Sequence, residues 1–216
     1  MGQLFHPNAN AIAKISIFGG VFIVAALVWA AAELYRSPYV TRAGDPISQP
    51  VPFSHKHHVS DVGIDCRYCH ASVERSSFAG IPPTKTCIGC HAILWADAPM
   101  LEPVRKSFQT GDPIRWKRVN YLPQFVFFNH SIHVNKGIGC TSCHGPVGEM
   151  PLTWQQETLH MRWCLDCHEN PEKFVRPVEE VFNPHWKPPA NQLEQGRKLV
   201  KQHNIKKLND CYTCHR

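Results

Sequence analysis

The sequence is poor in charge, poor in strand-like patterns and nearly without long hydrophobic runs. Asp, Glu, Lys and Arg make up 19% of the 216 residues and apolar residues 43%, a balance that argues against a disordered chain. A single apolar stretch is long enough to cross a bilayer, which excludes a protein with several membrane spans. The length suits one domain, or two small ones, plus a short anchor.

No cysteine of the sequence stands alone. The ten cysteines form five C-x-x-C pairs, and a histidine directly follows each pair. Two thiols at this spacing reach the two vinyl groups of one porphyrin, and the adjacent imidazole binds the iron from one side. The motifs, each with its proximal histidine, are Cys66, Cys69 and His70; Cys87, Cys90 and His91; Cys140, Cys143 and His144; Cys164, Cys167 and His168; and Cys211, Cys214 and His215.

Zinc and disulfides are the competing interpretations of so many cysteines. Zinc ribbons use C-x-x-C pairs in twos, which does not explain an odd number of pairs with a histidine after each. A disulfide framework explains the even cysteine count but not the constant two-residue gap. The pattern therefore predicts five covalently attached haem c groups. Because such haems are attached outside the bacterial cytoplasmic membrane, we expect the cysteine-bearing part to lie on the periplasmic or extracytoplasmic side.

The uncharged run at 15–32 predicts a single transmembrane helix. Eighteen residues at 1.5 Å rise cover about 27 Å, close to the thickness of the hydrocarbon core. A cleaved signal peptide is the alternative, since Ala30, Ala31 and Ala32 offer a small-residue cleavage site. The run exceeds the usual length of a signal-peptide core, so we expect a retained anchor in the cytoplasmic membrane with its N-terminus in the cytoplasm.

An internal repeat organises the remainder of the chain. The pattern F-x-H-x-x-H occurs at Phe53 and again at Phe128, each time ahead of two haem motifs. The predicted parts are an anchor at 1–36, a Pro-rich tether at 37–52, a first dihaem module at 53–91, a connecting segment at 92–127, a second dihaem module at 128–168, and a C-terminal extension with the fifth haem at 169–216.

The predicted fold class is mainly α-helical with much irregular coil, organised around haem. Residues 37–216 provide about 36 residues per haem, too few for a conventional apolar core around each one. The porphyrins themselves are therefore expected to form the interior. A helix is expected at 191–203, where Leu193, Leu199 and Val200 follow a helical period.

The repeat also nominates ligands for the second axial position of each iron. A spacing of three residues places two imidazoles on one face of a helical turn, so that they can serve two different haems. The expected distal ligands are His55, His58, His130, His133 and His203. Other candidates stay open: His57 or His185, and, for a haem with one thioether or a different imidazole, Met161, His160 or Met150.

These motifs carry a family resemblance. The pattern before the first haem motif of each module resembles class III multihaem cytochromes. The stretches F-S-H-K-H-H-V, G-I-D-C-R-Y-C-H, I-P-P-T-K-T-C-I-G-C-H, P-I-R-W-K-R-V, L-P-Q-F-V-F-F-N-H-S-I-H-V-N-K-G-I-G-C and M-R-W-C-L-D-C-H-E-N-P-E are similar to the pentahaem cytochrome subunits of bacterial alternative complex III. His160 departs from that family, which leaves the ligands of the haem at Cys164 open.

The resemblance implies electron relay in a respiratory or photosynthetic quinol-oxidising complex. Membrane subunits, with an iron–sulfur subunit among them, would supply electrons to the haems. A soluble monohaem cytochrome c, a blue copper protein or a terminal oxidase would accept them. The alternatives are a stand-alone membrane-anchored quinol dehydrogenase and a catalytic multihaem reductase, which needs an open iron position.

The formal charge of +6 does not point to nucleic acid. Each ferric haem with two histidine ligands contributes about −1, from a porphyrin–iron core of +1 and two ionised propionates, so the oxidised holoprotein carries about +1.

Overall fold

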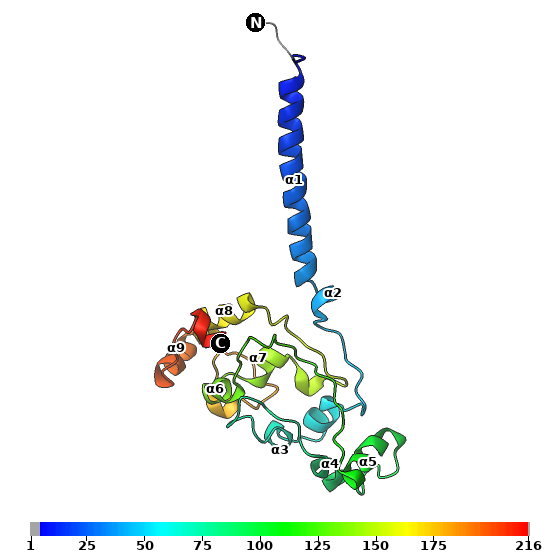
Figure 1. Cartoon of the computed structure of the whole chain (residues 1–216). Helices are drawn as coiled ribbons and strands as arrows, with labels where there is room; N and C mark the ends of the chain where they lie inside the picture. The colour runs from blue at the N-terminus through cyan, green and yellow to red at the C-terminus, as the bar shows by residue number, and fades with distance from the viewer. Residues whose placement is uncertain (1–4, 216) are drawn as a thin grey trace. The chain divides into compact units, whose positions relative to one another are not determined.

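The computed structural model describes residues 5–215, which form two compact units that meet at Arg42 and Ala43 (Figure 1). In the first unit, α1 (Ala9–Arg36) contains the whole uncharged run and extends beyond it at both ends. None of its residues is buried, and by length and composition it is the one helix of the described chain that could cross a membrane. A short helix, α2 (Pro38–Thr41), follows and begins with proline, whose fixed φ suits a first helical turn.

The segment 37–52, predicted as a Pro-rich tether, begins with α2, and its residues from Ala43 onward belong to the second unit. The Gly44 amide donates to the Gln155 carbonyl at 2.8 Å, and the Ile47 amide donates to the Thr153 carbonyl at 3.2 Å. Backbone groups of an extended segment need partners, and the second module supplies them.

The second unit consists of short helical segments joined by coil. In chain order they are η1 (His57–Asp61, a π-helical turn), α3 (Cys66–Cys69), α4 (Thr84–His91), η2 (Pro99–Leu101), α5 (Glu102–Thr110), α6 (His130–Asn135), α7 (Cys140–His144), η3 (Val147–Glu149), α8 (Met161–Glu169), η4 (Pro171–Lys173), η5 (Val178–Glu180), α9 (Gln192–Gln202) and α10 (Cys211–Cys214). Within residues 5–215, extended pairing is limited to three isolated bridges. The mainly helical fold with much coil is confirmed, as is the helix expected at 191–203.

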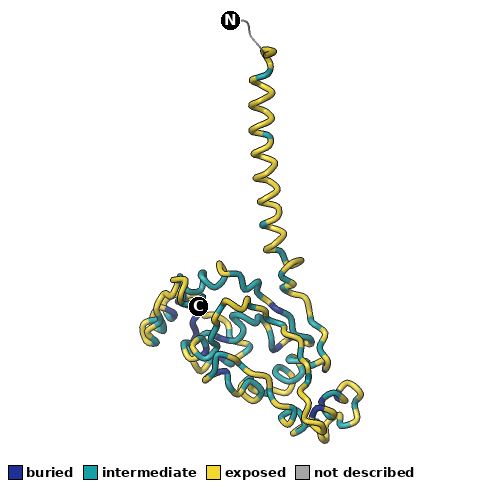
Figure 2. Tube along the Cα trace, viewed as in Figure 1, coloured by how far each residue is buried: buried dark blue, intermediate teal, exposed yellow. Residues whose placement is uncertain are grey.

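The apolar core of the second unit is small, as the ratio of residues to haems predicts (Figure 2). It consists of two separate clusters. One is Val51 with Leu101 and Val104, and the other is formed by the buried valines Val73, Val134 and Val181. Clusters of this size cannot by themselves offset the entropy of ordering so much coil, so the fold depends on what fills the space between the helices.

Candidate haem-binding sites

Each of the five C-x-x-C-H motifs lies on a helical turn. The motifs occupy α3, α7 and α10 completely, and parts of α4 and α8. In a helix, residues three apart lie on the same face, so both thiols of a motif point toward one porphyrin edge. Asp65 and Asp210 begin two of these turns, and their side chains accept from the amides of Arg67 and Thr213. All ten thiols are free of disulfide bonds.

Four of the five proximal histidines face a second histidine ring. The four pairs are His55 with His70 at 6.5 Å between ring centres, His130 with His144 at 6.4 Å, His58 with His91 at 6.2 Å, and His133 with His168 at 6.2 Å. An iron held at about 2 Å by nitrogens of two opposed imidazoles would set the ring centres about 6.3 Å apart. The spacing therefore fits haem iron between the rings of every pair.

The two modules repeat this geometry. The first histidine of each F-x-H-x-x-H faces the first haem motif with nearly parallel rings, at 9° for His55 and 2° for His130. The second histidine faces the second haem motif with crossed rings, at 65° for His58 and 63° for His133. The two histidines of one short helical turn thus face the histidines of two different C-x-x-C-H motifs.

The phenylalanine of the repeat fixes the ligand rings. Phe53 stacks on His58 at 4.4 Å and meets His55 edge-on at 4.9 Å. Phe128 stacks on His133 at 4.5 Å and meets His130 edge-on at 4.8 Å. This role was not assigned from the sequence, although the repeated phenylalanine was the visible signal.

Hydrogen bonds at Nδ1 leave Nε2 available for iron. The Nδ1 atoms of His58 and His133 donate to the carbonyls of residues 54 and 129, each at 2.8 Å. His70 and His91 donate in the same way to the carbonyls of residues 80 and 94, at 2.7 and 2.9 Å. Because Nδ1 carries the proton, the lone pair lies on Nε2, which is the nitrogen left available to bind a metal.

Burial keeps the central ligands neutral. Burial, reinforced by the neighbouring His70, lowers the pKa of His55 to about 4. Burial, followed by the charges of His130 and His70, lowers the pKa of His144 to about 4. A neutral imidazole is the form that binds a metal, so these rings are ready to ligate at neutral pH.

The modules hold each other's ligands in place. The Nδ1 atom of His55, in the first module, lies 3.0 Å from the hydroxyl of Thr153, which belongs to the second. Reciprocally, the Nδ1 atom of His130 donates to the carbonyl of Ser77, in the first module, at 2.8 Å. Each module therefore supplies a hydrogen-bond partner for a histidine of the other module.

The attachment helices follow a spatial order that differs from their order in the sequence. The thiols of Cys66 and Cys140 lie close enough to shift each other's pKa, which places the first and third motifs side by side. Burial and then Cys87 raise the pKa of Cys69, which places the second motif beside the first. The pKa of Cys143 is raised to about 12 by burial and by the neighbouring Cys167 and Cys164, so the third and fourth motifs are neighbours. The pKa of Cys164 is raised by burial and by the neighbouring Cys214, so the fourth and fifth motifs are neighbours. These neighbouring thiols indicate the order second, first, third, fourth, fifth for the attachment motifs.

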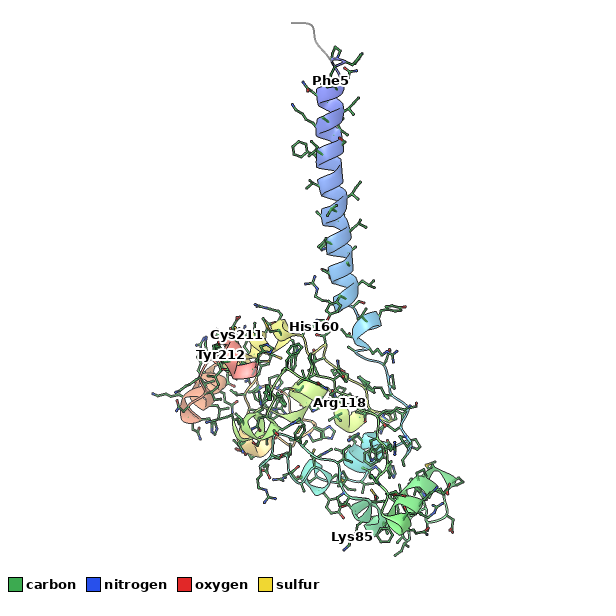
Figure 3. All side chains as sticks on the ribbon, in the orientation of Figure 1. Phe5, Lys85, Arg118, His160, Cys211 and Tyr212 are labelled. Carbon is green, nitrogen blue, oxygen red and sulfur yellow. The ribbon has the colours of Figure 1, made fainter. Side chains whose placement is uncertain are left out.

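The ends of that series lie far apart. Lys85 on α4, within the helix of the second motif, and Cys211 on α10, in the fifth, are at opposite ends of the second unit (Figure 3).

The fifth motif lacks an opposed imidazole in the described part of the chain. The Nδ1 atom of His215 donates to the Phe125 carbonyl at 3.2 Å, and the Phe125 ring lies 5.7 Å from the imidazole. His203 directly follows α9, and its carbonyl accepts from Lys136 Nζ, but its ring is not opposed to His215. The assignment of His203 stays a prediction.

The remaining candidates occupy different environments. His160 is the N-cap residue of α8, Met161 is exposed, and Met150 is completely buried, with its carbonyl accepting from the Lys56 amide. The His57 ring stacks on Trp95 at 5.2 Å. No group of three or more His, Cys, Asp or Glu side chains in residues 5–215 is arranged to hold a bare metal ion.

Comparison with known proteins identifies relatives. Residues 126–216 match a family model described as cytochrome c7 and related cytochrome c. The chain is also 33% identical, over 174 residues, to the menaquinone reductase multihaem cytochrome c subunit of Nitratidesulfovibrio vulgaris. That alignment covers 69% of this chain and 79% of the relative.

Proposed function

The chain belongs to the multihaem cytochromes c, and on that premise we propose that it carries five haem c groups and relays electrons between a quinone-reactive membrane complex and an acceptor outside the membrane. The observation that carries the proposal is the set of four opposed imidazole pairs, 6.2–6.5 Å apart, beside the thiols of four attachment motifs. Low-spin haem with two histidine ligands exchanges single electrons without opening a coordination position.

The chain's own residues hold and insulate the relay. Bound haem c supplies one-electron exchange between ferric and ferrous iron. The cysteines fix each porphyrin edge, and the proposed distal ligands His55, His58, His130 and His133 close the second side. Hydrogen bonds at Nδ1 and the stacked phenylalanines keep those rings in one orientation, so that coordination does not rearrange when the charge on iron changes.

The order of the attachment helices supports a linear relay. The proposed path runs through the second, first, third, fourth and fifth haems, with the contact between Cys66 and Cys140 as the junction of the two modules. Electrons would enter at one end of this series and leave at the other. The haem at Cys87 and the haem at Cys211 are therefore the proposed points of exchange with partners.

The finer proposal is a subunit of alternative complex III. The quoted sequence stretches support it, together with one apolar helix that suits an anchor with the N-terminus in the cytoplasm and the haem domain outside. The relative's name joins a multihaem cytochrome to a menaquinone-reacting enzyme. Proposed partners are membrane subunits, an iron–sulfur subunit, and a soluble cytochrome, a copper protein or an oxidase.

A catalytic reductase is the second candidate, and the fifth motif favours it. Among residues 5–215, this is the motif whose proximal histidine faces a phenylalanine ring instead of an imidazole. An iron without a second protein ligand would bind small molecules. Carbon monoxide binding to the reduced holoprotein separates the two: no binding supports a relay, and about one equivalent per chain supports catalysis at the fifth haem.

The relay is tested on the full chain, solubilised gently from membranes with its partners. We expect five haems per polypeptide by pyridine haemochrome assay, partner subunits that co-purify, and rapid haem reduction by a menaquinol analogue. Isolation of a stable, fully haem-loaded chain without partners and without quinol-dependent reduction would contradict the proposal.

A further inference from the structure

Arg176 is a buried cation at the third haem motif. Its side chain is 3% exposed and lies in the coil between η4 and η5. One terminal nitrogen of its guanidinium donates to the hydroxyls of Thr141 and Ser142 at 3.0 and 3.2 Å. These two residues are the middle positions of the motif that begins at Cys140, so the charge is held directly against that attachment helix.

No carboxylate in the described part of the chain pairs with this guanidinium. Its hydrogen bonds go to neutral oxygens: the two hydroxyls and the backbone carbonyl of Glu180 at 3.5 Å. The Glu180 carboxylate instead accepts from Asn183. The buried Nε atom of Arg176 has no hydrogen-bond partner. Since arginine stays protonated in proteins, the site carries a positive charge that no carboxylate contacts directly, although the charge of Glu180 acts on it from nearby.

The sequence before Cys140 makes room for this charge. A Cβ atom at Gly139 would lie 2.1 Å from Arg176 Cζ, and one at Gly137 would lie 2.4 Å from the Arg176 carbonyl oxygen. Gly137 also has a φ of +85°, which favours glycine. On its other side, the guanidinium lies 4.2 Å from the centre of the Trp186 ring. Glycine at both positions of the G-I-G-C segment therefore leaves the space that Arg176 occupies.

At the first haem motif, the neighbouring arginine is exposed and paired with a carboxylate. Asp65 stands directly before Cys66, where Gly139 stands before Cys140. The nearby Arg67 also lies over an aromatic ring, that of Phe182, at 4.6 Å. Arg67, however, is bound by Asp65 through two hydrogen bonds of 2.9 and 2.8 Å and is half exposed. Arg67 is therefore paired directly with a carboxylate at an exposed site, whereas Arg176 is buried and has no carboxylate in direct contact.

We propose that Arg176 raises the reduction potential of the haem attached at Cys140 and Cys143, relative to the haem at Cys66 and Cys69. This inference rests on the proposed haem content and relay. Ferric haem with two neutral ligands has a core charge of +1 and ferrous haem has none, so a nearby cation favours the reduced form. The asymmetry draws electrons across the junction from the first module to the second.

Removing the charge gives a measurable change. One unit charge at roughly 10 Å, with an effective dielectric constant of about 20, shifts an equilibrium about tenfold. For a one-electron couple this corresponds to about 59 mV. Arg176→Gln, which keeps donors for Thr141 and Ser142, should lower the potential of the third haem by about this amount. Arg176→Lys should restore most of it.

The test is a redox titration of the holoprotein followed by electron paramagnetic resonance. Haems with nearly parallel imidazoles give rhombic low-spin signals, distinct from the signals of haems with crossed rings. The ring angles assign the rhombic signals to the haems at His70 and His144. Arg176→Gln should shift one of these two. The control Arg67→Gln removes the same charge from a half-exposed site, where solvent and salt screen it, and should shift neither by a comparable amount.

A second variant keeps the test informative if Arg176→Gln fails to fold. Thr141→Asp leaves Arg176 in place and gives it a carboxylate partner, so it should lower the same potential. An unchanged or raised potential in both variants, at full haem content, would overturn the proposal. Haem content and low-spin signals of the unmodified protein are measured in the same series. If these are not as expected, the relay itself fails, independently of Arg176.

Discussion

At the scale of single residues, the distal histidines are the most directly testable feature. His130→Ala removes one ring of the pair with His144, whose centres lie 6.4 Å apart. We expect one haem in five to become high-spin, while the other low-spin signals persist. The measurement is the optical and paramagnetic resonance spectrum of the ferric holoprotein.

His57→Ala is the matched control for that variant. His57 also belongs to an F-x-H-x-x-H segment, but its ring stacks on Trp95 and is not opposed to a proximal histidine. The control should keep the low-spin signals of the unmodified protein. A fully low-spin spectrum of His130→Ala would remove the assignment of His130.

At the scale of elements, α1 combines length and apolar composition with a complete lack of buried residues. Val24→Lys places a charge near the middle of this helix, which costs about 2.5–3.5 kcal/mol in a bilayer. We expect a lower fraction of the protein in the membrane pellet and less haem-loaded product. Membrane fractionation and haem staining measure both.

Asn10→Lys provides the control for the anchor. Asn10 lies in the first turn of α1, where a charge can reach the headgroup region. It should leave membrane retention unchanged. Equal retention of both variants and the unmodified chain would mean that α1 is not the anchor.

At the scale of the whole molecule, the crossed support between the modules makes a specific prediction. Thr153→Val removes the hydroxyl beside His55 Nδ1, although Thr153 follows the third haem motif in the sequence. A hydrogen bond from Nδ1 increases the basicity of an iron-bound imidazole, so its loss should raise the potential of the first haem. Redox titration of the two rhombic signals measures the shift.

Thr158→Val is the control for Thr153→Val, since its hydroxyl accepts from the His160 amide and lies outside the proposed His55 pair. It should leave both rhombic signals at their original potentials. If Thr153→Val instead changes the third haem and spares the first, the crossed arrangement of the modules is wrong.

The charge of the holoprotein also belongs to the whole molecule. The chain alone carries +6, and the five proposed ferric haems would bring the total to about +1. In the proposed relay, recognition of a partner would therefore depend on local charge more than on net charge.

Local sequence determined the chemistry of this protein. The C-x-x-C-H spacing fits one porphyrin because both thiols lie on one helical turn, and α3, α7 and α10 are such turns. The mainly helical class with much coil followed from the shortage of residues for a core. The uncharged run predicted α1 because a helix of that many residues, at 1.5 Å rise per residue, is about as long as the hydrocarbon core of a bilayer is thick.

Only the tertiary structure decided which residues meet. That His55 faces His70, while His58 faces His91, depends on coil segments whose paths no local pattern specifies. The contact of Cys66 with Cys140 and the burial of Arg176 beside Thr141 join positions 74 and 35 residues apart. Such contacts arise from packing between modules, which is non-local, so the sequence determined the haem sites and the fold determined their order.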